Sequence, residues 1–462
     1  MVNITTLSQV FKFRARVVDK LPRTLHTLGT NIILIPLGIA SSVLIARSIG
    51  PAGKGSFDLI VATSTVLLTA LGLSLPAGVT YEVARGDTNV RSLALALVLI
   101  AAAQAVICCG ILITIISFGK ASYFLPSLNQ RWWIPAIAVY FFLEMLANHW
   151  RAILVGRQEI TKSNHSELLG RLTQFVLLFV LAGLLFLNGK QITVAVLFAM
   201  VLTISIVLNV LLLRALRPAF ASEGTRNPLR GAFKFALPCY LGNLVQFLNY
   251  RLDLFILGAL AGYASVGRYT LAVGLGQMIW LLSSSAANVL LPKIAASDGS
   301  TDSIQNTNRL NRLIFAASLL SALCMGIVAS QAIPLLYGAA FWPSFPALLL
   351  ILPGIAAFST VNILAAYLAG IGQPRLNLMV AVAALFVTVG LDLYLIPKLD
   401  ILGASLASTA SYSVSALLTM FLYMRKTGSS LRQLLFPTSE DLGLAMQLAQ
   451  PVLRRFRPQR AL

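Results

Sequence analysis

Twelve runs of apolar residues, each long enough to cross a lipid bilayer, limit what this chain can fold into. A transmembrane helix needs about 20 consecutive residues that are mostly apolar. No loop between the runs exceeds about 20 residues, so no soluble catalytic domain is expected. The sequence therefore predicts an all-α integral membrane protein with helices at 25–49, 57–80, 92–118, 131–154, 168–187, 191–214, 235–260, 268–292, 312–336, 342–370, 376–397 and 402–424.

Composition and charge support the same class. Hydrophobic residues make up 58% of the chain and charged residues only 11%, whereas soluble domains have about 45–50% and about 25%. With the N-terminus placed inside, 27 lysines and arginines fall in inner segments and seven in outer loops. This asymmetry is the positive-inside pattern. The net charge of +20 is therefore explained by topology and by attraction to anionic lipid, and we expect cytoplasmic termini and no nucleic-acid partner.

The sequence carries little of the chemistry of an enzyme. Its outer loops contain no cluster of histidines or carboxylates, and the three histidines are predicted on the inner side: His26, His149 and His165. Four cysteines in apolar runs give neither a disulfide framework nor a metal-ligand spacing: Cys108, Cys109, Cys239 and Cys324. We expect no catalysis, no metal and no cofactor.

A glycine-rich stretch, GPAGKGSF at Gly50 to Phe57, looks at first like a phosphate-binding loop. That motif requires Gly-Lys-Ser/Thr after a strand, but here Lys54 is followed by Gly55 and a membrane segment precedes the stretch. We predict a tight turn between the first two spans instead.

The same turn recurs in the second half of the chain. GYASVGRY begins at Gly262, and an offset of 212 residues aligns it with Gly50 and also aligns Asn243 with Asn31. Two halves of six spans each have the same orientation and are expected to be related by a pseudo-two-fold axis along the membrane normal. The predicted parts are a basic cytoplasmic lead-in at 1–24, an N-terminal six-helix lobe at 25–214, a cytoplasmic linker at 215–234, a C-terminal six-helix lobe at 235–424 and a basic cytoplasmic tail at 425–462, with a surface amphipathic helix in the tail.

Two stretches of the second half resemble a known family. NYRLDLFILGALAGYASVGRYTLAVGLGQMIWLLSSSAANVLLPKIA, from Asn249, is similar to the polysaccharide-biosynthesis, Wzx-type oligosaccharide (O-antigen) flippases, with matches at Asp253, Gly262, Gly267, Tyr269 and Pro292. LDLYLIPKLDILGASLAS, from Leu391, resembles a second signature of that family. Asp392 departs from it, because the family usually has asparagine there.

The resemblance implies a fold and a function. It implies two six-helix lobes around a central cleft, as in the multidrug/oligosaccharidyl-lipid/polysaccharide (MOP) exporters. By alternating access, such a protein moves a polyprenyl-diphosphate-linked glycan from the inner to the outer leaflet of the bacterial inner (plasma) membrane. The implied partners are that glycan and membrane lipid, and other proteins of polysaccharide assembly are further candidates.

Polar residues inside the spans are the candidate binding residues, because a charge there costs at least about 2.5 kcal/mol and should face a cavity or a partner. Three spans each carry such residues at a spacing that places them on one helix face. They are Glu144, Asn148 and Arg151 in span 4, Asn243, Gln246, Tyr250 and Asp253 in span 7, and Gln277 and Asn288 in span 8. For the uncharged residues of these three sets, the alternative role is hydrogen bonding between neighbouring helices. Arg251 is the preferred contact for the diphosphate, with Arg47, Arg85 and Arg268 as weaker candidates.

Two other functional classes remain open. A multidrug efflux pump or a lipid II flippase of the same superfamily would share the fold and the repeat. A polytopic glycan polymerase or ligase would act on a similar lipid, but it would need a large outer loop with catalytic groups.

Overall fold

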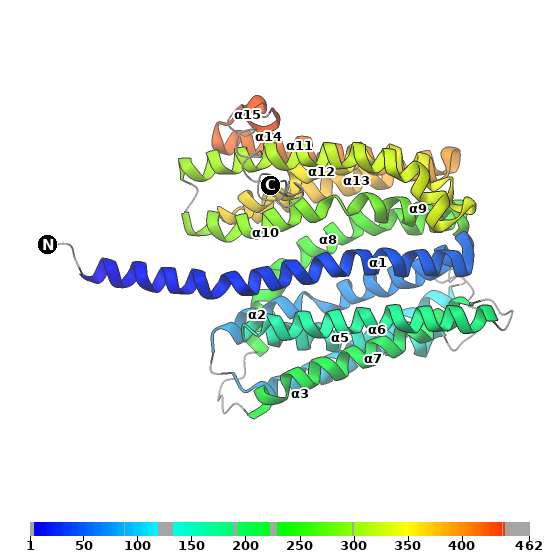
Figure 1. Cartoon of the computed structure of the whole chain (residues 1–462), viewed down its shortest axis with the longest axis horizontal. Coiled ribbons are helices and arrows are strands. Elements are labelled where there is room, and N and C mark those ends of the chain that lie inside the picture. Colours follow the sequence, from blue (N-terminus) through cyan, green and yellow to red (C-terminus); the bar gives the residue numbers. More distant parts are fainter. Residues whose placement is uncertain are drawn as a thin grey trace, which may run out of the picture. The chain divides into compact units, whose positions relative to one another are not determined.

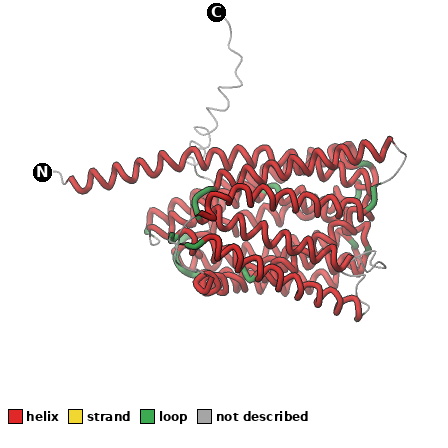
Figure 2. The backbone as a smooth tube through the Cα atoms, turned by 90° about the horizontal axis from the view of Figure 1, so that it is seen from below, coloured by secondary structure: helices red, strands yellow, loops and turns green. Residues whose placement is uncertain are grey.

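The computed structural model describes the backbone of residues 4–86, 88–118, 133–187, 192–221, 229–297, 300–436 and 438. Within these ranges it describes side chains from Leu34 onward, except those of residues 185–186, 221, 238–239 and 296–297. Within these ranges every regular element is a helix and no strand is present (Figure 2). The predicted tail helix and the side chains before Leu34, which include those of the basic lead-in and Asn31, lie outside the described part.

The helices follow the predicted apolar segments in order (Figure 1). They are α1 (Ile4–Gly72), α2 (Leu75–Ala84), α3 (Val90–Ser117), α5 (Trp133–Gly156), α6 (Ile160–Leu187), α7 (Val194–Leu216), α8 (Leu229–Ala261), α9 (Tyr263–Gln277), α10 (Trp280–Ser297), α11 (Thr301–Ala332), α12 (Ser344–Gly370), α13 (Pro374–Leu399), α14 (Ile401–Thr427) and α15 (Leu431–Leu435), with short turns η1 (Arg217–Ala221), η2 (Ile333–Tyr337) and η3 (Ala339–Phe341). Among the described residues nine helices are long and apolar enough to cross a membrane, or ten with the bent pair α9 and α10. The prediction of an all-α multi-pass membrane protein is confirmed.

The glycine turn is also confirmed, and both copies have the same backbone conformation. Gly50 interrupts α1 with φ 66° and ψ −177°, and Gly262 precedes α9 with φ 85° and ψ 175°. This combination of dihedral angles is essentially restricted to glycine. The sequence match at an offset of 212 residues therefore corresponds to a repeated structural device.

The second span of each half is broken as well. In the first half α1 ends at Gly72 and α2 begins at Leu75, with Leu73 and Ser74 at positive φ. In the second half α9 and α10 meet at an angle of 48°. Such a break leaves backbone carbonyls without helical partners. In the first half side chains replace the lost bonds: Gln104 Nε2 donates to the Leu71 carbonyl at 2.7 Å, and the Tyr240 hydroxyl donates to the Ala70 carbonyl at 2.8 Å.

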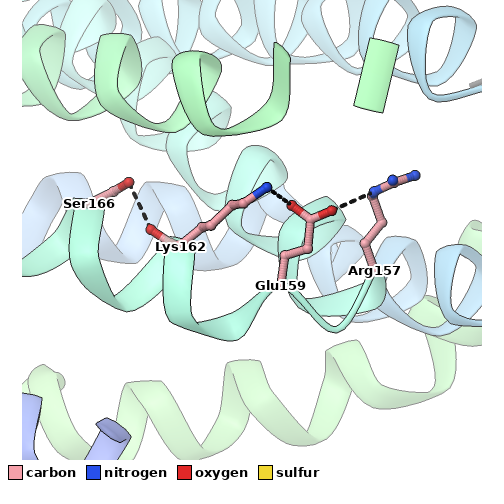
Figure 3. A network of polar contacts seen from close by, with 4 residues as sticks. All are labelled: Arg157, Glu159, Lys162 and Ser166. Atoms are coloured by element: carbon pink, nitrogen blue, oxygen red, sulfur yellow. Dashed lines mark hydrogen bonds and ion pairs between the residues drawn. The ribbon is translucent and has the colours of Figure 1, made fainter. Parts of the chain in front are cut away.

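One predicted helix start was wrong. The fifth span was expected to begin at 168, but α6 begins at Ile160, because a helix continues beyond the apolar run when its polar first turn is bonded. Lys162 and Arg157 both donate to the carboxylate of Glu159, at 2.9 and 3.2 Å (Figure 3). As a result Glu167, which precedes the predicted span, lies within the helix.

Glu159 gives a prediction of pH dependence. Burial alone would raise the pKa of Glu159, but the hydrogen bonds and charges of Lys162 and Arg157 outweigh burial and hold the pKa below its ordinary value of 4.5. A lowered pKa in the folded state adds stability above the unfolded value, and this stability is lost as the pH falls through the folded pKa. We expect Glu159→Gln to lower the thermal midpoint slightly at about pH 7, with the difference from wild type shrinking as the pH falls below 4.5 and through the lower folded pKa. Melting curves in detergent test this, and an equal difference at both pH values would contradict it.

Contacts divide the chain into two units, Met1–Leu244 and Val245–Leu462. The helix α8 contributes residues to both units. The predicted linker at 215–234 consists of the end of α7, η1 and the start of α8, and its residues 222–228 lie outside the described part. In the first unit, Phe141, Trp150 and Leu97 belong to a buried apolar core formed by α1–α3, α5, α7 and the start of α8. In the second unit α12 is the central helix, and 72% of its apolar window is buried.

Large apolar side chains are exposed on the outer helices of both units. On α3 they include Leu95, Leu99 and Val106, and on α11 Leu320, Leu323 and Ile327. Continuous exposed apolar surface of this kind is typical of contact with lipid rather than water.

A close helix contact in the second unit gives a stability prediction. A Cβ atom at Gly354 of α12 would lie 2.6 Å from the Cα of Thr409 in α14, whereas a Cβ at Gly390 of α13 would meet nothing within 4 Å. We expect Gly354→Ala to destabilise the protein by about 1–3 kcal/mol. Gly390→Ala should be neutral or stabilising, because alanine is the better helix former by about 1 kcal/mol. Thermal unfolding in detergent compares the two variants, and equal midpoints would contradict the close packing of α12 on α14.

Candidate functional site

Polar side chains from four helices meet inside the second unit. We call this group the C-terminal polar core, and it comprises Asn249 and Asp253 of α8, Tyr269 of α9, Thr388 and Asp392 of α13, and Ser408 and Ser411 of α14. All seven side chains are buried. Buried polar groups in a membrane protein must find partners within the protein, because neither lipid nor water is available to them.

Asp253 lies at one side of this core. The Tyr269 hydroxyl donates to Asp253 Oδ2 at 2.6 Å and lies 2.8 Å from the Ser408 hydroxyl, and the Leu254 amide donates to Oδ1 at 2.8 Å. The carboxylate is only 3% exposed. Asp253 is thus held between α9 and α14 in the interior of the unit, with its two oxygens bonded.

One helical turn away, a second set of bonds joins α8, α13 and α14. The Thr388 hydroxyl is shared between Asn249 Oδ1 at 3.2 Å and the Ser411 hydroxyl at 2.7 Å. Three crossings separate α8 from α13, so the two helices run in the same direction. Asp253 follows Asn249 by four residues and Asp392 follows Thr388 by four, so both aspartates lie one turn further along the same interface.

Asp392 is the unusual member of the core. Its side chain is fully buried, and neither carboxylate oxygen has a hydrogen-bond partner among the described residues. It lies within Coulombic range of Asp253. Burying an ionised carboxylate without a partner costs several kcal/mol. A carboxylate in this place therefore requires a proton or a cation, and the neighbouring Asp253 adds to that requirement.

Aromatic side chains border the polar core. Tyr250, Trp280, Phe358 and Tyr412 form a cluster with ring centroids 4.9–5.9 Å apart. The predicted residues Gln246 and Gln277 bond to Tyr250 and Tyr412 of this cluster. In span 7, Tyr250 therefore belongs to the aromatic cluster and Gln246 contacts it, whereas Asp253 belongs to the polar core.

The first unit contains a cavity of about 270 Å³ between α1, α5, α6 and α7, which we call the N-terminal cavity. Its charged lining residues are Glu144, Arg151, Glu167 and Arg171, and Phe57, Tyr140, Gln174 and Ser205 also line it. A second cavity of about 210 Å³, beside the ion pair of Lys54 and Asp58, shares Phe57, Arg171 and Gln174 with it. Glu144 and Arg151, both on the polar face predicted for span 4, line the N-terminal cavity, and their contact with substrate stays a prediction.

The other predicted residues are dispersed. Asn148 accepts a bond from Arg151 at 3.4 Å, and Asn243 donates to the Ser74 hydroxyl at the break of the second span, at 3.1 Å. Arg85 pairs with Glu82 at 3.7 Å, and Arg268 donates to the Ala340 carbonyl at 3.1 Å.

Three further candidates complete the set. Arg251 is half-buried, whereas Arg47 and Asn288 are exposed. Their contacts with substrate stay predictions. In the part of the chain that the structure describes, no group of three or more His, Cys, Asp or Glu residues could hold a metal ion.

The comparison with protein families supplies the context for these sites. The sequence model described as "Polysaccharide biosynthesis protein" matches residues 23–297, which is more than half of the chain. The chain belongs to the polysaccharide biosynthesis protein family. The matched part contains the N-terminal cavity and both copies of the glycine turn. No curated protein sequence matches the chain.

Solved structures show that this family member shares the fold of MOP transporters. An inward-facing multidrug resistance MATE transporter matches with a TM-score of 0.70 and 14% identity, over 87% of this chain and 98% of that one. The lipid II flippase MurJ matches with a TM-score of 0.68 and 12% identity, over 92% and 96%. A MATE transporter from Vibrio cholerae matches with a TM-score of 0.61 and 13% identity, over 89% and 97%. At such low identity the likeness concerns the fold alone.

Proposed function

We propose that this protein moves a polyprenyl-diphosphate-linked oligosaccharide from the inner to the outer leaflet of the bacterial inner membrane, with both termini in the cytoplasm. The observation that carries the proposal is the match to the polysaccharide biosynthesis family on a fold shared with a lipid II flippase. A transporter in such a family has a substrate with a large polar head and a long apolar tail.

The physical task explains why polar groups are needed inside the spans. The diphosphate and the sugar hydroxyls lose their bonds to water on entering the membrane, and each unpaired group is costly. Hydroxyl, amide and carboxylate side chains replace those bonds, while the isoprenoid stays in lipid. Arg251 is the proposed diphosphate contact, because a guanidinium offers forked donors that match phosphate oxygens.

The carboxylates of the C-terminal polar core supply a way to couple transport to an ion. Asp392 requires a proton or a cation when it is buried, and a conformation that opens the core to water would release it. The ion would then bind one state better than the other, which is the requirement for coupling. We therefore assign Asp253 and Asp392 the role of ion carrier.

Deletion in the native host tests the proposed function. We expect the lipid-linked glycan to accumulate in the inner leaflet and surface glycan to be lost, with both restored by the wild-type gene. Normal surface glycan together with lost drug resistance would favour a multidrug efflux pump. Accumulation of lipid II would favour the lipid II flippase alternative.

A further inference from the structure

The four charged groups that line the N-terminal cavity do not pair with one another. Among the described residues, no carboxylate oxygen lies within ion-pairing distance of Arg151 or Arg171, although Glu144 and Glu167 line the same cavity. Within the described ranges Arg171 donates to Gln174 at 3.3 Å, and the Nε of Arg151 is buried without a hydrogen-bond partner there. Unpaired charges within membrane helices are expensive and mark functional sites.

The charges of the lining select the class of ligand. Two carboxylates and two guanidinium groups cancel, and the adjoining cavity adds a further balanced pair, Lys54 and Asp58. A diphosphate would need an excess of positive charge, and a metal ion or organic cation would need an excess of negative charge. A balanced lining suits an uncharged ligand that offers both donors and acceptors.

The volume of the N-terminal cavity and its remaining lining residues indicate that the uncharged ligand is a sugar. Carboxylates accept from hydroxyls, and guanidinium and amide groups donate to them. Phe57 and Tyr140 supply aromatic walls, and Gly170 leaves the face of α6 between Glu167 and Arg171 without a side chain. A volume of about 270 Å³ lies just below the usual range for small-molecule sites, about 300–1,000 Å³. It accommodates one ring and not a whole oligosaccharide.

We propose that the N-terminal cavity is a subsite for one uncharged pyranose ring, bound by Glu144, Arg171 and Gln174. The proposal rests on the proposed function, because the ring would be a unit of the transported glycan. It adds that the N-terminal unit itself recognises the sugar and thereby contributes to substrate specificity.

Protection of a single cysteine tests the subsite without requiring transport. In a nanodisc-reconstituted variant with the four native cysteines replaced by serine, Val201→Cys places a thiol on the wall of the N-terminal cavity without removing a proposed contact. The probes are methyl glycosides of glucose, galactose and N-acetylglucosamine, and the readout is the rate of alkylation by N-ethylmaleimide. At about 50 mM glycoside and a Kd of about 10 mM, the rate should fall about sixfold. Ile204→Cys, which also lines the cavity, is the second reporter should Val201→Cys not fold.

Matched variants connect the protection to the lining. Glu144→Gln removes a charged acceptor and should reduce the protection from about sixfold to below about twofold. Glu159→Gln, a carboxylate outside the cavity, should leave it unchanged. Thr419→Cys, in a small cavity of the second unit, should show no protection.

Three results would overturn the proposal: no protection by any glycoside, equal protection by mannitol, or stronger protection by pyrophosphate. The first means a cavity that holds only water, the second an osmotic effect and the third an anion site. Protection in a protein whose deletion leaves lipid-linked glycans unchanged would instead contradict the proposed function and leave the subsite in place.

Discussion

Asp392→Asn is expected to reduce transport about 5- to 150-fold, the range of a typical coupling free energy between two sites, and to remove its dependence on an ion gradient. Asparagine has the size of aspartate but takes up neither a proton nor a cation. Since the variant also removes a buried carboxylate without hydrogen-bond partners among the described residues, its thermal midpoint should equal or exceed that of the wild type. Flipping of a fluorescent lipid-linked glycan in proteoliposomes, with imposed proton or sodium gradients, measures the effect.

The companion variant Asp253→Asn distinguishes a loss of ion coupling from a loss of stability. Asp253 accepts hydrogen bonds from Tyr269 and from the Leu254 amide, so its replacement should lower both transport and the thermal midpoint. If Asp392→Asn transports at the wild-type rate and keeps the wild-type gradient dependence, the C-terminal polar core does not carry the ion.

Arg251→Ala is expected to lower glycan flipping at least about thirtyfold, because removing one partner of a desolvated charged contact costs about 2–5 kcal/mol. The lipid-linked glycan should remain in the leaflet where it is made. Arg251→Lys should recover only part of the activity, because lysine keeps the charge but loses the forked donors. Complementation of the deletion strain with the wild type, Arg251→Lys or Arg251→Ala, followed by analysis of lipid-linked intermediates, measures the flipping activity of each.

Arg268→Ala is the matched control for Arg251→Ala. Arg268 donates to the Ala340 carbonyl within its own unit, so its loss should affect stability more than flipping. Equal flipping defects in the two variants would indicate a general effect of removing arginine, and normal flipping in Arg251→Ala would remove that residue from the diphosphate site.

The helices were predictable because an apolar run that crosses lipid must satisfy its backbone polar groups within the segment, which an α-helix does. The glycine turn at Gly50 and Gly262 was predictable for a related reason, since the conformation that it requires is open to so few residues. Glu144 and Arg151 were found from helical spacing within one apolar segment. All of these features are local in the chain.

The rest of the candidate sites depends on contacts that sequence spacing does not show. Glu167 was placed just before the predicted fifth span at 168–187 because the first turns of α6 are polar, and only these extra turns bring it to the cavity. Arg171 lay inside that span but was not among the candidate binding residues. Asp392 was noted only as a departure from a family signature, and its proximity to Asp253 depends on the pairing of α8 with α13. The hydroxyls of α14 gave one overlooked signal, because Ser408 and Ser411 recur with helical spacing.

The break between α9 and α10 has a consequence for how the protein is made. With 15 residues and a rise of about 1.5 Å per residue, α9 is about 22 Å long, shorter than the hydrocarbon layer of about 30 Å. During synthesis it cannot be released into lipid as an independent span. Its insertion therefore depends on α10, the other half of the bent pair.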